Sequence, residues 1–416
     1  MTLLQFVAAF LFAIALIHTF TAPFFARLAH RYPRHEGLLH LLGEVEVVFG
    51  FWAFILIIAM ALIAGGDVAL EYAESRHYTE PLFVFVIMVM AASRPVLELV
   101  RAVVSRIARM LPMDMTLARV WLCLWLVPLI GSLITEPAAM TLAALMLSPL
   151  VFRPGMPEWL KYASLGVLFV NVSIGGTLTS FAAPPVLMVA AKWGWDSSFM
   201  FLHFGWKAAL AVLINASVVS WLLRRHLIEA EIVPTSHEEG VPRIVCLIHL
   251  FFLAGVVMFA HHPVIFLGLF LFFLGFTKAY ARHQAPLLLK EALLVGFFLA
   301  GLVVLGGMQQ WWLQPIVANL EPTALFFGAL ALTAITDNAA LTYLGSLVEG
   351  MSDAAKYMLM AGAVAGGGLT VIANAPNPAG MALLRGGFRN RVVTVQGLLF
   401  GAILPTVTGA LCFLLL

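Results

Sequence analysis

Long apolar runs are the feature that most restricts how this chain can fold. Stretches such as Leu3 to Ala26 and Leu39 to Ala64 reach the length of about 20 residues that a helix needs to cross a hydrocarbon core about 30 Å thick. Only 11% of the residues are charged, whereas a soluble domain typically has about 25%. Because a lipid-exposed segment must satisfy its backbone polar groups internally, we expect an all-α polytopic membrane protein.

Charge and cysteine content exclude several other classes of protein. With 23 basic and 21 acidic residues, the composition gives no reason to expect a nucleic-acid partner. Cys123, Cys246 and Cys412 are far apart and lie inside apolar runs, so neither a disulfide framework nor a thiolate metal site is indicated. The sequence shows no nucleophile–base pair or metal-ligand set at membrane depth, so we expect neither an enzyme nor a cofactor. No basic segment precedes the first run, and we expect residues 1–26 to remain as a mature span.

The positions of lysine and arginine predict which loops face the cytoplasm. The first run is followed by Arg27, Arg31 and Arg34, whereas the segment 67–80 is mainly acidic. Basic residues are enriched in cytoplasmic loops, so the first loop is expected inside and the second outside. Continued along the chain, this pattern predicts about ten transmembrane helices, with both termini external, in the cytoplasmic (inner) membrane.

The chain is expected to consist of two halves with the same plan. Residues 1–225 form the predicted first repeat, residues 226–243 a cytoplasmic linker, and residues 244–416 the second repeat. Each half is predicted to contain one re-entrant helical hairpin and one broken helix, at about 116–150 and 158–191 in the first half and about 322–348 and 354–384 in the second. An odd number of crossings in the first half leaves the second half inverted in the membrane.

Two short motifs support the repeat. Residues 135–141 read TEPAAMT and align without gaps with residues 336–342, which read TDNAALT. Downstream, residues 175–179 read GGTLT and align with residues 366–370, which read GGGLT. Both matches occur in the same order and at the polar interruption of an apolar run. Inverted repeats with interrupted helices are typical of secondary transporters, whose binding site lies where the interruptions converge.

Glu136 and Asp337, which this alignment pairs, are the strongest functional candidates. An ionised carboxylate at the bilayer centre costs at least about 2.5 kcal/mol, so it is expected to be paired, protonated or bound to a cation. Burial and mutual repulsion favour the protonated form, whereas a bound sodium ion favours the ionised form. We therefore expect both acids to bind cations and protons, with Thr135, Thr336 and Asn338 adding neutral oxygens. The alternative is that both acids only cap the helices that follow them.

Glycine, proline and small polar residues at the interruptions are expected to form the pocket. Glycine permits close backbone approach, and proline removes a hydrogen bond that would continue the helix. The predicted pocket residues are Gly175, Gly176, Thr179, Pro184, Pro185, Gly367, Gly368, Thr370, Asn374, Pro376 and Asn377. Alternatively, these residues only kink the helices or allow them to pack closely.

The tip and break motifs together resemble those of the ion transporter superfamily, which includes sodium/proton antiporters and sodium-coupled dicarboxylate carriers. The dicarboxylate carriers have Ser-Asn-Thr at their tips, whereas this chain has an acid at the middle position in both halves, in 135–137 and 336–338. The chain is most similar to the putative sodium/proton antiporter family. That resemblance implies a homodimer in which hairpins and broken helices form a transport domain that moves like an elevator.

The sequence therefore predicts a secondary active transporter that exchanges a cation, Na⁺, for H⁺ by alternating access. Its expected partners are the lipid bilayer, small ions and a second copy of the chain, without nucleic acid. The alternative is a sodium-coupled symporter of a small organic or inorganic anion, with Lys192 or Arg385 as the counter-charge.

Overall fold

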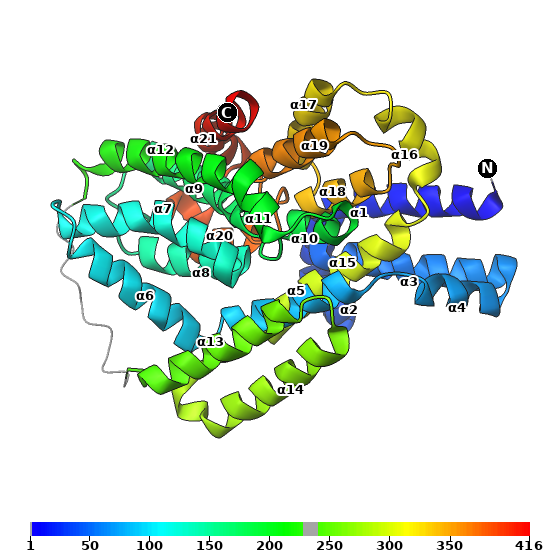
Figure 1. Ribbon diagram of the computed structural model, residues 1–416, viewed down its shortest axis with the longest axis horizontal. Coiled ribbons are helices and arrows are strands. Elements are labelled where there is room, and N and C mark those ends of the chain that lie inside the picture. The colour runs from blue at the N-terminus through cyan, green and yellow to red at the C-terminus, as the bar shows by residue number, and fades with distance from the viewer. Residues whose placement is uncertain (1, 228–239) are drawn as a thin grey trace. The chain divides into compact units, whose positions relative to one another are not determined.

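The computed structural model describes residues 2–227 and 240–416, and all regular structure in these residues is helical (Figure 1). Six helices in this part are long and apolar enough to cross a membrane. These spans are Leu3–Ala22, Val45–Ala64, Met115–Ile134, Ser197–Leu223, Leu289–Gly306 and Val395–Leu415. The protein is therefore a polytopic, multi-pass membrane protein.

The run that starts at Pro81 is not one straight span. Helices α5 (Thr79–Ala91) and α6 (Arg94–Ala108) are bent by 63° at a short break. Ser93 is extended there, and Pro95 follows in the first turn of α6. Proline lacks an N–H and its ring clashes with the carbonyl four residues earlier, so α5 cannot continue through this point.

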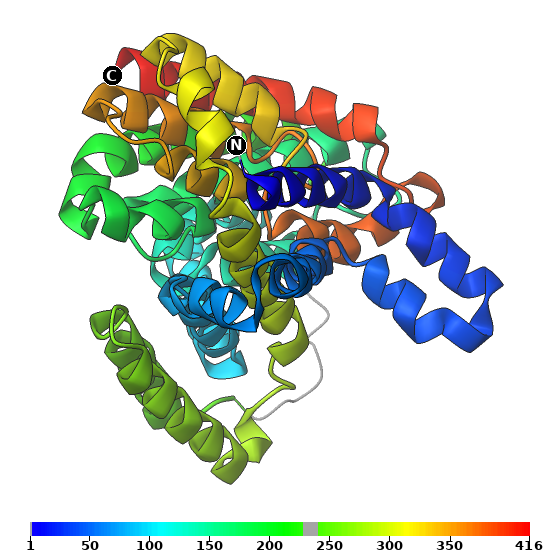
Figure 2. The same cartoon turned by 90° about the vertical axis from the view of Figure 1, so that its right-hand side faces the viewer.

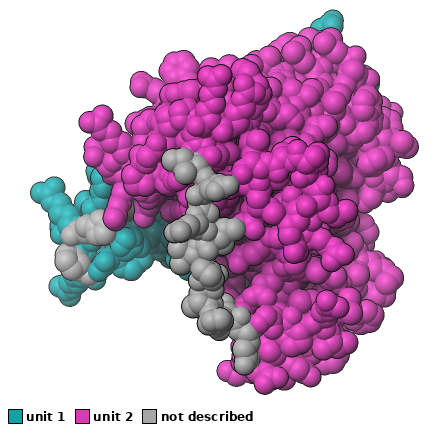
Figure 3. Space-filling model, turned by 90° about the vertical axis from the view of Figure 1, so that its left-hand side faces the viewer, with its two compact units in different colours: residues 1–85, 289–321, 343–352 teal, residues 86–288, 322–342, 353–416 magenta. Residues whose placement is uncertain are grey.

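The chain divides into two compact units, which Figure 3 colours teal and magenta. Unit 1 contains residues 1–85, 289–321 and 343–352, and unit 2 contains residues 86–288, 322–342 and 353–416. Each unit draws on both predicted halves of the sequence, whose repeat boundaries remain a prediction. The predicted linker 226–243 falls largely outside the described residues.

Unit 1 is built around the contact between two apolar spans. Its helices are α1 (Leu3–Arg31), α2 (Glu36–Leu42), α3 (Val45–Ala64), α4 (Gly66–Glu74), α15 (Leu289–Gly306) and α16 (Gln310–Val317), with the start of α5. Helix α3 packs along α15. A side chain at Gly301 would meet the backbone of Phe49 and Gly50, so the two helices approach closely. The Phe49 ring packs edge-on against Phe298 with centroids 5.2 Å apart.

Unit 2 contains the first predicted hairpin, both predicted broken helices, and the second predicted hairpin as far as Thr342. Besides α6 and the end of α5, its helices are α7 (Met115–Ile134), α8 (Glu136–Leu147), α9 (Glu158–Gly175), α10 (Pro184–Trp193), α11 (Ser197–Met200), α12 (Trp206–Leu223), α13 (Arg243–Met258), α14 (Pro263–Ala279), α17 (Pro322–Thr333), the first residues of α18 (Asn338–Ser346), α19 (Asp353–Gly366), α20 (Asn377–Leu384) and α21 (Val395–Leu415). Helices α13 and α14 lie side by side as a hairpin (Figure 2).

All four predicted interruptions are breaks between helices. The break between α7 and α8 is the single residue Thr135, whose φ of 87° is a left-handed value that β-branched residues rarely adopt. Prolines begin the helix after two other breaks, with Pro184 and Pro185 in α10 and Pro378 in the first turn of α20. Proline in a first turn costs no hydrogen bond, so it allows a new helix to start where the old one cannot continue.

Helices α9 and α21 cross with their backbones in close contact. A side chain at Gly166 would meet the backbone of Gly401 and Ala402, and one at Gly401 would meet the carbonyl of Tyr162. Small residues at such crossings allow the close packing that holds membrane helices together. This contact fixes α9, which carries one of the predicted interruptions.

We expect Gly166→Ala to lower the stability of the folded protein by about 1–3 kcal/mol, because the added methyl group pushes two backbones apart. Gly268→Ala on α14 is the matched control, since a side chain there meets nothing within 4 Å and alanine favours a helix. Thermal unfolding in detergent measures both variants. Equal melting temperatures for the two would show that the α9–α21 contact does not stabilise the fold.

Candidate functional site

Glu136 is the first residue of α8, and its side chain is completely buried. Its Oε2 accepts a hydrogen bond from Asn374 Nδ2 at 2.9 Å. Its Oε1 has no hydrogen-bond partner in residues 2–227 and 240–416. A buried carboxylate oxygen without a donor is costly, so this atom is the one around which the site is built.

Three buried asparagines lie at the helix breaks, and one of them, Asn374, contacts this carboxylate. Asn338, Asn374 and Asn377 each have no exposed surface. The backbone N–H of Asn338 donates to Ala373 O at 3.1 Å, directly before the asparagine that donates to Glu136. We refer to Glu136 and these three asparagines as the acid–amide cluster. Its members come from α8, α18, the break before α20 and the first residue of α20, so the helix interruptions bring them together.

The hydrogen bonds determine which way each amide faces. Asn377 Nδ2 donates to Gly367 O at 2.8 Å and to Thr370 O at 2.9 Å. Asn338 Nδ2 lies 3.5 Å from Ser173 Oγ, whose own proton goes to Val364 O. Since a carbonyl can only accept, and Ser173 already donates, these amide atoms must be the nitrogens.

Four acceptor oxygens of the cluster consequently remain without donors. Within the described part of the chain, Glu136 Oε1 and the Oδ1 atoms of Asn338, Asn374 and Asn377 accept no hydrogen bond. Buried polar atoms in native proteins are almost always paired with protein, water or an ion. Carboxylate and amide oxygens are the ligands that hard cations prefer, so the cluster has the chemistry of a cation site.

Two glycines allow the breaks to approach these side chains. A side chain at Gly176 would collide with the Glu136 carboxylate, and one at Gly367 would meet Ser173 Oγ and Asn338 Nδ2. Both glycines lie directly after the last residue of a helix, α9 in one case and α19 in the other. Only glycine leaves room for so close an approach, because any side chain at these positions would displace the neighbouring group.

Asp337 has a different environment from Glu136. Its Oδ1 accepts hydrogen bonds from the backbone N–H groups of Ala339 at 2.8 Å and Ala340 at 3.1 Å, so it caps the N-terminus of α18. Thr135, the residue before α8, makes no such bond with its side chain. Asp337 directly precedes Asn338 of the cluster in the chain, so its charge lies beside the cluster.

The structure therefore shifts the sequence alignment of the two tips by one residue. Glu136 and Asn338 are the first residues of α8 and α18, whereas Asp337 corresponds in position to Thr135. Gly176 and Gly367, which the second motif pairs, contact Glu136 and Asn338 respectively. The sequence alignment maximised residue identity and paired Glu136 with Asp337, whereas the contacts pair Glu136 with Asn338.

The same one-residue shift recurs in two further contacts. Thr179 Oγ1 donates to Ser132 O at 2.6 Å, and Thr370 Oγ1 donates to Ala334 O at 2.8 Å. These two threonines thus fasten each broken helix to the preceding hairpin and do not contribute free hydroxyls to the cluster. Gly175 also belongs to this contact region: a side chain there would meet the carbonyl oxygen of Pro128 in α7.

Comparison with known protein families shows which family the chain belongs to. Residues 3–416 match the family described as putative Na⁺/H⁺ antiporter. The chain belongs to this family. No curated protein matches the chain. Membership of this family points to a transporter, in a protein whose apolar helices already place it in a membrane.

The remaining predicted site residues lie at the helix breaks, where most of them contact the backbone or neighbouring helices. Pro185 O accepts a hydrogen bond from Thr342 Oγ1 at 2.9 Å, which ties α10 to α18. Gly368 packs against Val170 of α9. Thr336 Oγ1, which was predicted to bind the cation, donates to Leu332 O near the end of α17 at 2.8 Å. Thr135 Oγ1 is buried at the first break and has no hydrogen-bond partner in the part of the chain that the structure describes. Pro184 and Pro376 lie where α10 and α20 begin.

Two polar residues that contact the cluster or its breaks were not predicted. Ser173 bridges Asn338 and the carbonyl of Val364. Ser132 donates to Gly175 O at 2.7 Å and accepts from Leu178 N at 3.0 Å. Each serine lies a few residues before a break inside an otherwise apolar run, and that position is the signal that could have found them.

We expect Asp337→Ala to destabilise the antiporter by about 1 kcal/mol, because two backbone donors lose their acceptor. Asp337→Asn should be close to wild type in stability, since an asparagine oxygen caps a helix as well. Thermal unfolding in detergent distinguishes the two. A stability loss in Asp337→Asn equal to that in Asp337→Ala would show that charge, and not capping, is what this residue contributes to the fold.

Proposed function

We propose that this antiporter exchanges Na⁺ for H⁺ at the acid–amide cluster, with Glu136 as the group that holds the proton and the cation in turn. The observation that supports this most is the Glu136 carboxylate, which is fully buried and leaves Oε1 without a donor in the described residues. The family assignment makes cation/proton antiport the expected activity. Asp337 is proposed as a second acid that caps α18 and acts on Glu136 electrostatically.

The energetics of a buried carboxylate explain why proton and cation compete. A charged carboxylate in the membrane interior costs at least about 2.5 kcal/mol, and one neutral amide donor offsets only part of this. Binding a proton removes the charge, and binding Na⁺ compensates it with the help of the amide oxygens. The two occupants exclude each other because each neutralises the same charge, which is the condition for exchange.

The cluster is less suited to an anion. An anion needs hydrogen-bond donors or positive charge, yet the amide nitrogens of the cluster already donate to protein oxygens. The oxygens that remain would repel it. Sodium-coupled uptake of a small anion is thus the weaker alternative, and uptake of radiolabelled carboxylates into proteoliposomes under a sodium gradient would reveal it.

Alternating access by an elevator motion is part of the proposal. Both hairpins and both broken helices have their breaks in unit 2, as expected if this unit contains the transport domain. The recurring contacts of Thr179 and Thr370 support two repeats of inverted topology, with re-entrant hairpins at α7–α8 and α17–α18. The homodimer remains an expectation from the family resemblance.

We expect Glu136→Gln to reduce Na⁺-dependent proton flux to the background of protein-free liposomes, because a neutral amide cannot exchange a proton for a cation. Asp337→Asn keeps the helix cap and should reduce flux by about tenfold or less, since it loses only an electrostatic influence on Glu136. Collapse of a pH gradient in proteoliposomes on addition of Na⁺, Li⁺ or K⁺ measures both.

Melting temperatures of the two variants provide the folding control. A folded Glu136→Gln protein that transports like wild type would refute the assignment of Glu136. A folded Asp337→Asn protein without flux would instead show that both acids exchange ions, as the sequence alone suggests.

Asn374→Ala tests the amide ligands separately from the acid. Removing the donor to Glu136 and a free oxygen should raise the apparent KM for Na⁺ by about tenfold or more, because a hydrogen bond to a charged group contributes about 1.5–3 kcal/mol. Asn319→Ala is the control, since its exposed amide donates to Pro315 O of α16 and makes no bond to the cluster within the described residues. An unchanged KM in Asn374→Ala would remove the amides from the proposed cation site.

A further inference from the structure

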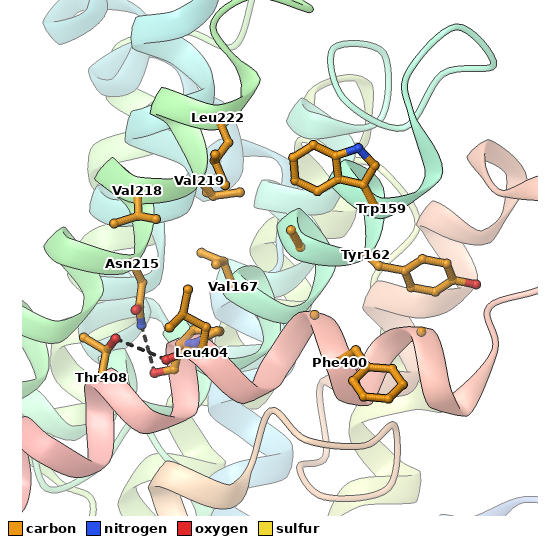
Figure 4. Close-up of a pocket in the computed structure, with 14 residues that line it drawn as sticks. Trp159, Tyr162, Val167, Asn215, Val218, Val219, Leu222, Phe400, Leu404 and Thr408 are labelled. Atoms are coloured by element: carbon orange, nitrogen blue, oxygen red, sulfur yellow. Dashed lines mark hydrogen bonds between the residues drawn. The ribbon is translucent and has the colours of Figure 1, made fainter.

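Unit 2 contains a cavity of about 490 Å³ that the proposed transport mechanism does not use. Figure 4 shows it between α9, α12 and α21. Its walls are mainly apolar, and most of the lining side chains are aliphatic or aromatic. Representative lining residues are Trp159, Val167, Val218, Leu222, Phe400 and Leu404.

The cavity opens sideways from the helices. Three of its apolar lining residues are largely exposed, with 58% for Trp159, 74% for Phe400 and 62% for Leu404. Helices α12 and α21 belong to candidate membrane spans, so this opening faces the surroundings of the spans. We refer to the cavity as the lateral groove. An aqueous solute would find few polar partners on such walls.

Polar side chains at the inner end of the lateral groove are already engaged. Asn215 Nδ2 donates to Asn171 Oδ1 at 3.0 Å and to Pro405 O at 3.2 Å. Thr408 Oγ1 donates to Leu404 O at 3.1 Å. Because these polar groups already have partners, the inner end does not need a polar ligand. A hydrocarbon chain is the occupant that matches its apolar walls.

The length of the lateral groove fits one leaflet of a bilayer. On α21 the lining residues extend from Gly397 to Thr408, which at 1.5 Å per residue is roughly 16 Å. Half of a hydrocarbon core about 30 Å thick has nearly the same depth. An acyl chain of ordinary length would thus fill the groove from the membrane surface to the midplane.

The outer end of the lateral groove lies where the chain is rich in arginine. Leu222 lines the groove, and Arg224 and Arg225 lie two and three residues later, just after the end of α12. Arg389 and Arg391 precede the start of α21. All four arginines are exposed. Basic residues beside spans attract anionic lipid headgroups at about 1 kcal/mol each.

Aromatic and acidic neighbours agree with this reading of the outer end. The Arg224 guanidinium lies over the Trp221 ring, 4.5 Å from its centroid. Tyr162 Oη and Thr394 Oγ1 are 3.1 Å apart and join α9 to the start of α21. Glu158 is paired with Lys161 at 2.8 Å. Tryptophan and tyrosine are enriched at membrane interfaces.

We propose that the lateral groove binds one anionic phospholipid, with an acyl chain between α9, α12 and α21 and the headgroup phosphate at Arg224 and Arg225. A second copy of the chain fits less well. A two-fold dimer brings the same patch of both copies together. The two grooves would then face each other without being filled, and the arginines of the two copies would repel each other. A lipid satisfies both the apolar walls and the positive outer end.

The test compares lipid binding by delipidated protein and two variants. Leu404→Trp fills the groove, and Arg224→Gln with Arg225→Gln removes the headgroup charge; Arg101→Gln with Arg106→Gln, on exposed positions of α6, is the control. We measure the melting temperature with added phosphatidylglycerol or phosphatidylcholine, and the lipid retained by mass spectrometry. Wild type and control should retain about tenfold more phosphatidylglycerol than phosphatidylcholine.

The two variants should fail in different ways. The arginine variant should lose the preference between lipids but still bind both, and Leu404→Trp should bind neither. Equal retention and preference in all four proteins would overturn the proposal. So would stabilisation of wild type by inorganic phosphate alone, which indicates an anion site without a chain. Loss of a dimer in Leu404→Trp, with lipid retention unchanged, would assign the groove to a second copy.

Discussion

The interaction on which the site depends is the single hydrogen bond between Asn374 and Glu136. This bond satisfies one carboxylate oxygen and leaves the other without a donor in the described residues. If several donors surrounded the carboxylate, its charge would be stable without any ion. If there were none, the group would remain protonated. In the proposed mechanism, partial compensation keeps both the proton and the cation available as occupants, and exchange requires that balance.

The helix breaks make this partial compensation of the Glu136 charge possible. A continuous helix would satisfy its own backbone and present only side chains, whereas the breaks before α8, α18 and α20 bring Glu136, Asn338 and Asn374 to one place. The breaks are stabilised by hydrogen bonds such as those that Thr179 and Thr370 donate to backbone carbonyls of the hairpins. Most polar groups at the interruptions therefore stabilise the backbone, so that a few oxygens can remain unpaired.

Much of this could be predicted from the sequence, because the signals are local. Apolar length gave the membrane spans, and the polar interruptions gave the helix breaks and the buried asparagines. The contacts of Ser173 were missed, since a lone serine in an apolar run is usually unremarkable. The bend at Ser93 was missed although Pro95, which ends the preceding helix, is visible in the sequence. The relation between Glu136 and Asp337 was shifted by one residue because letter identity outweighed helix position. Whether a side chain caps a helix or enters a cavity depends on φ and ψ at the break, which composition does not encode.

The shift has a mechanistic consequence. If both tips had an acid at the first helical residue, the cluster would contain two buried carboxylates and would need two cations or two protons to be neutral. Asn338 at that position in the second half leaves one full charge to be neutralised at the centre, with Asp337 held at the edge by the α18 backbone. One buried charge favours exchange of one proton for one monovalent cation, since any other ratio would leave uncompensated charge in a site that water screens poorly. The asymmetry between the halves, and not their similarity, thus sets the expected stoichiometry.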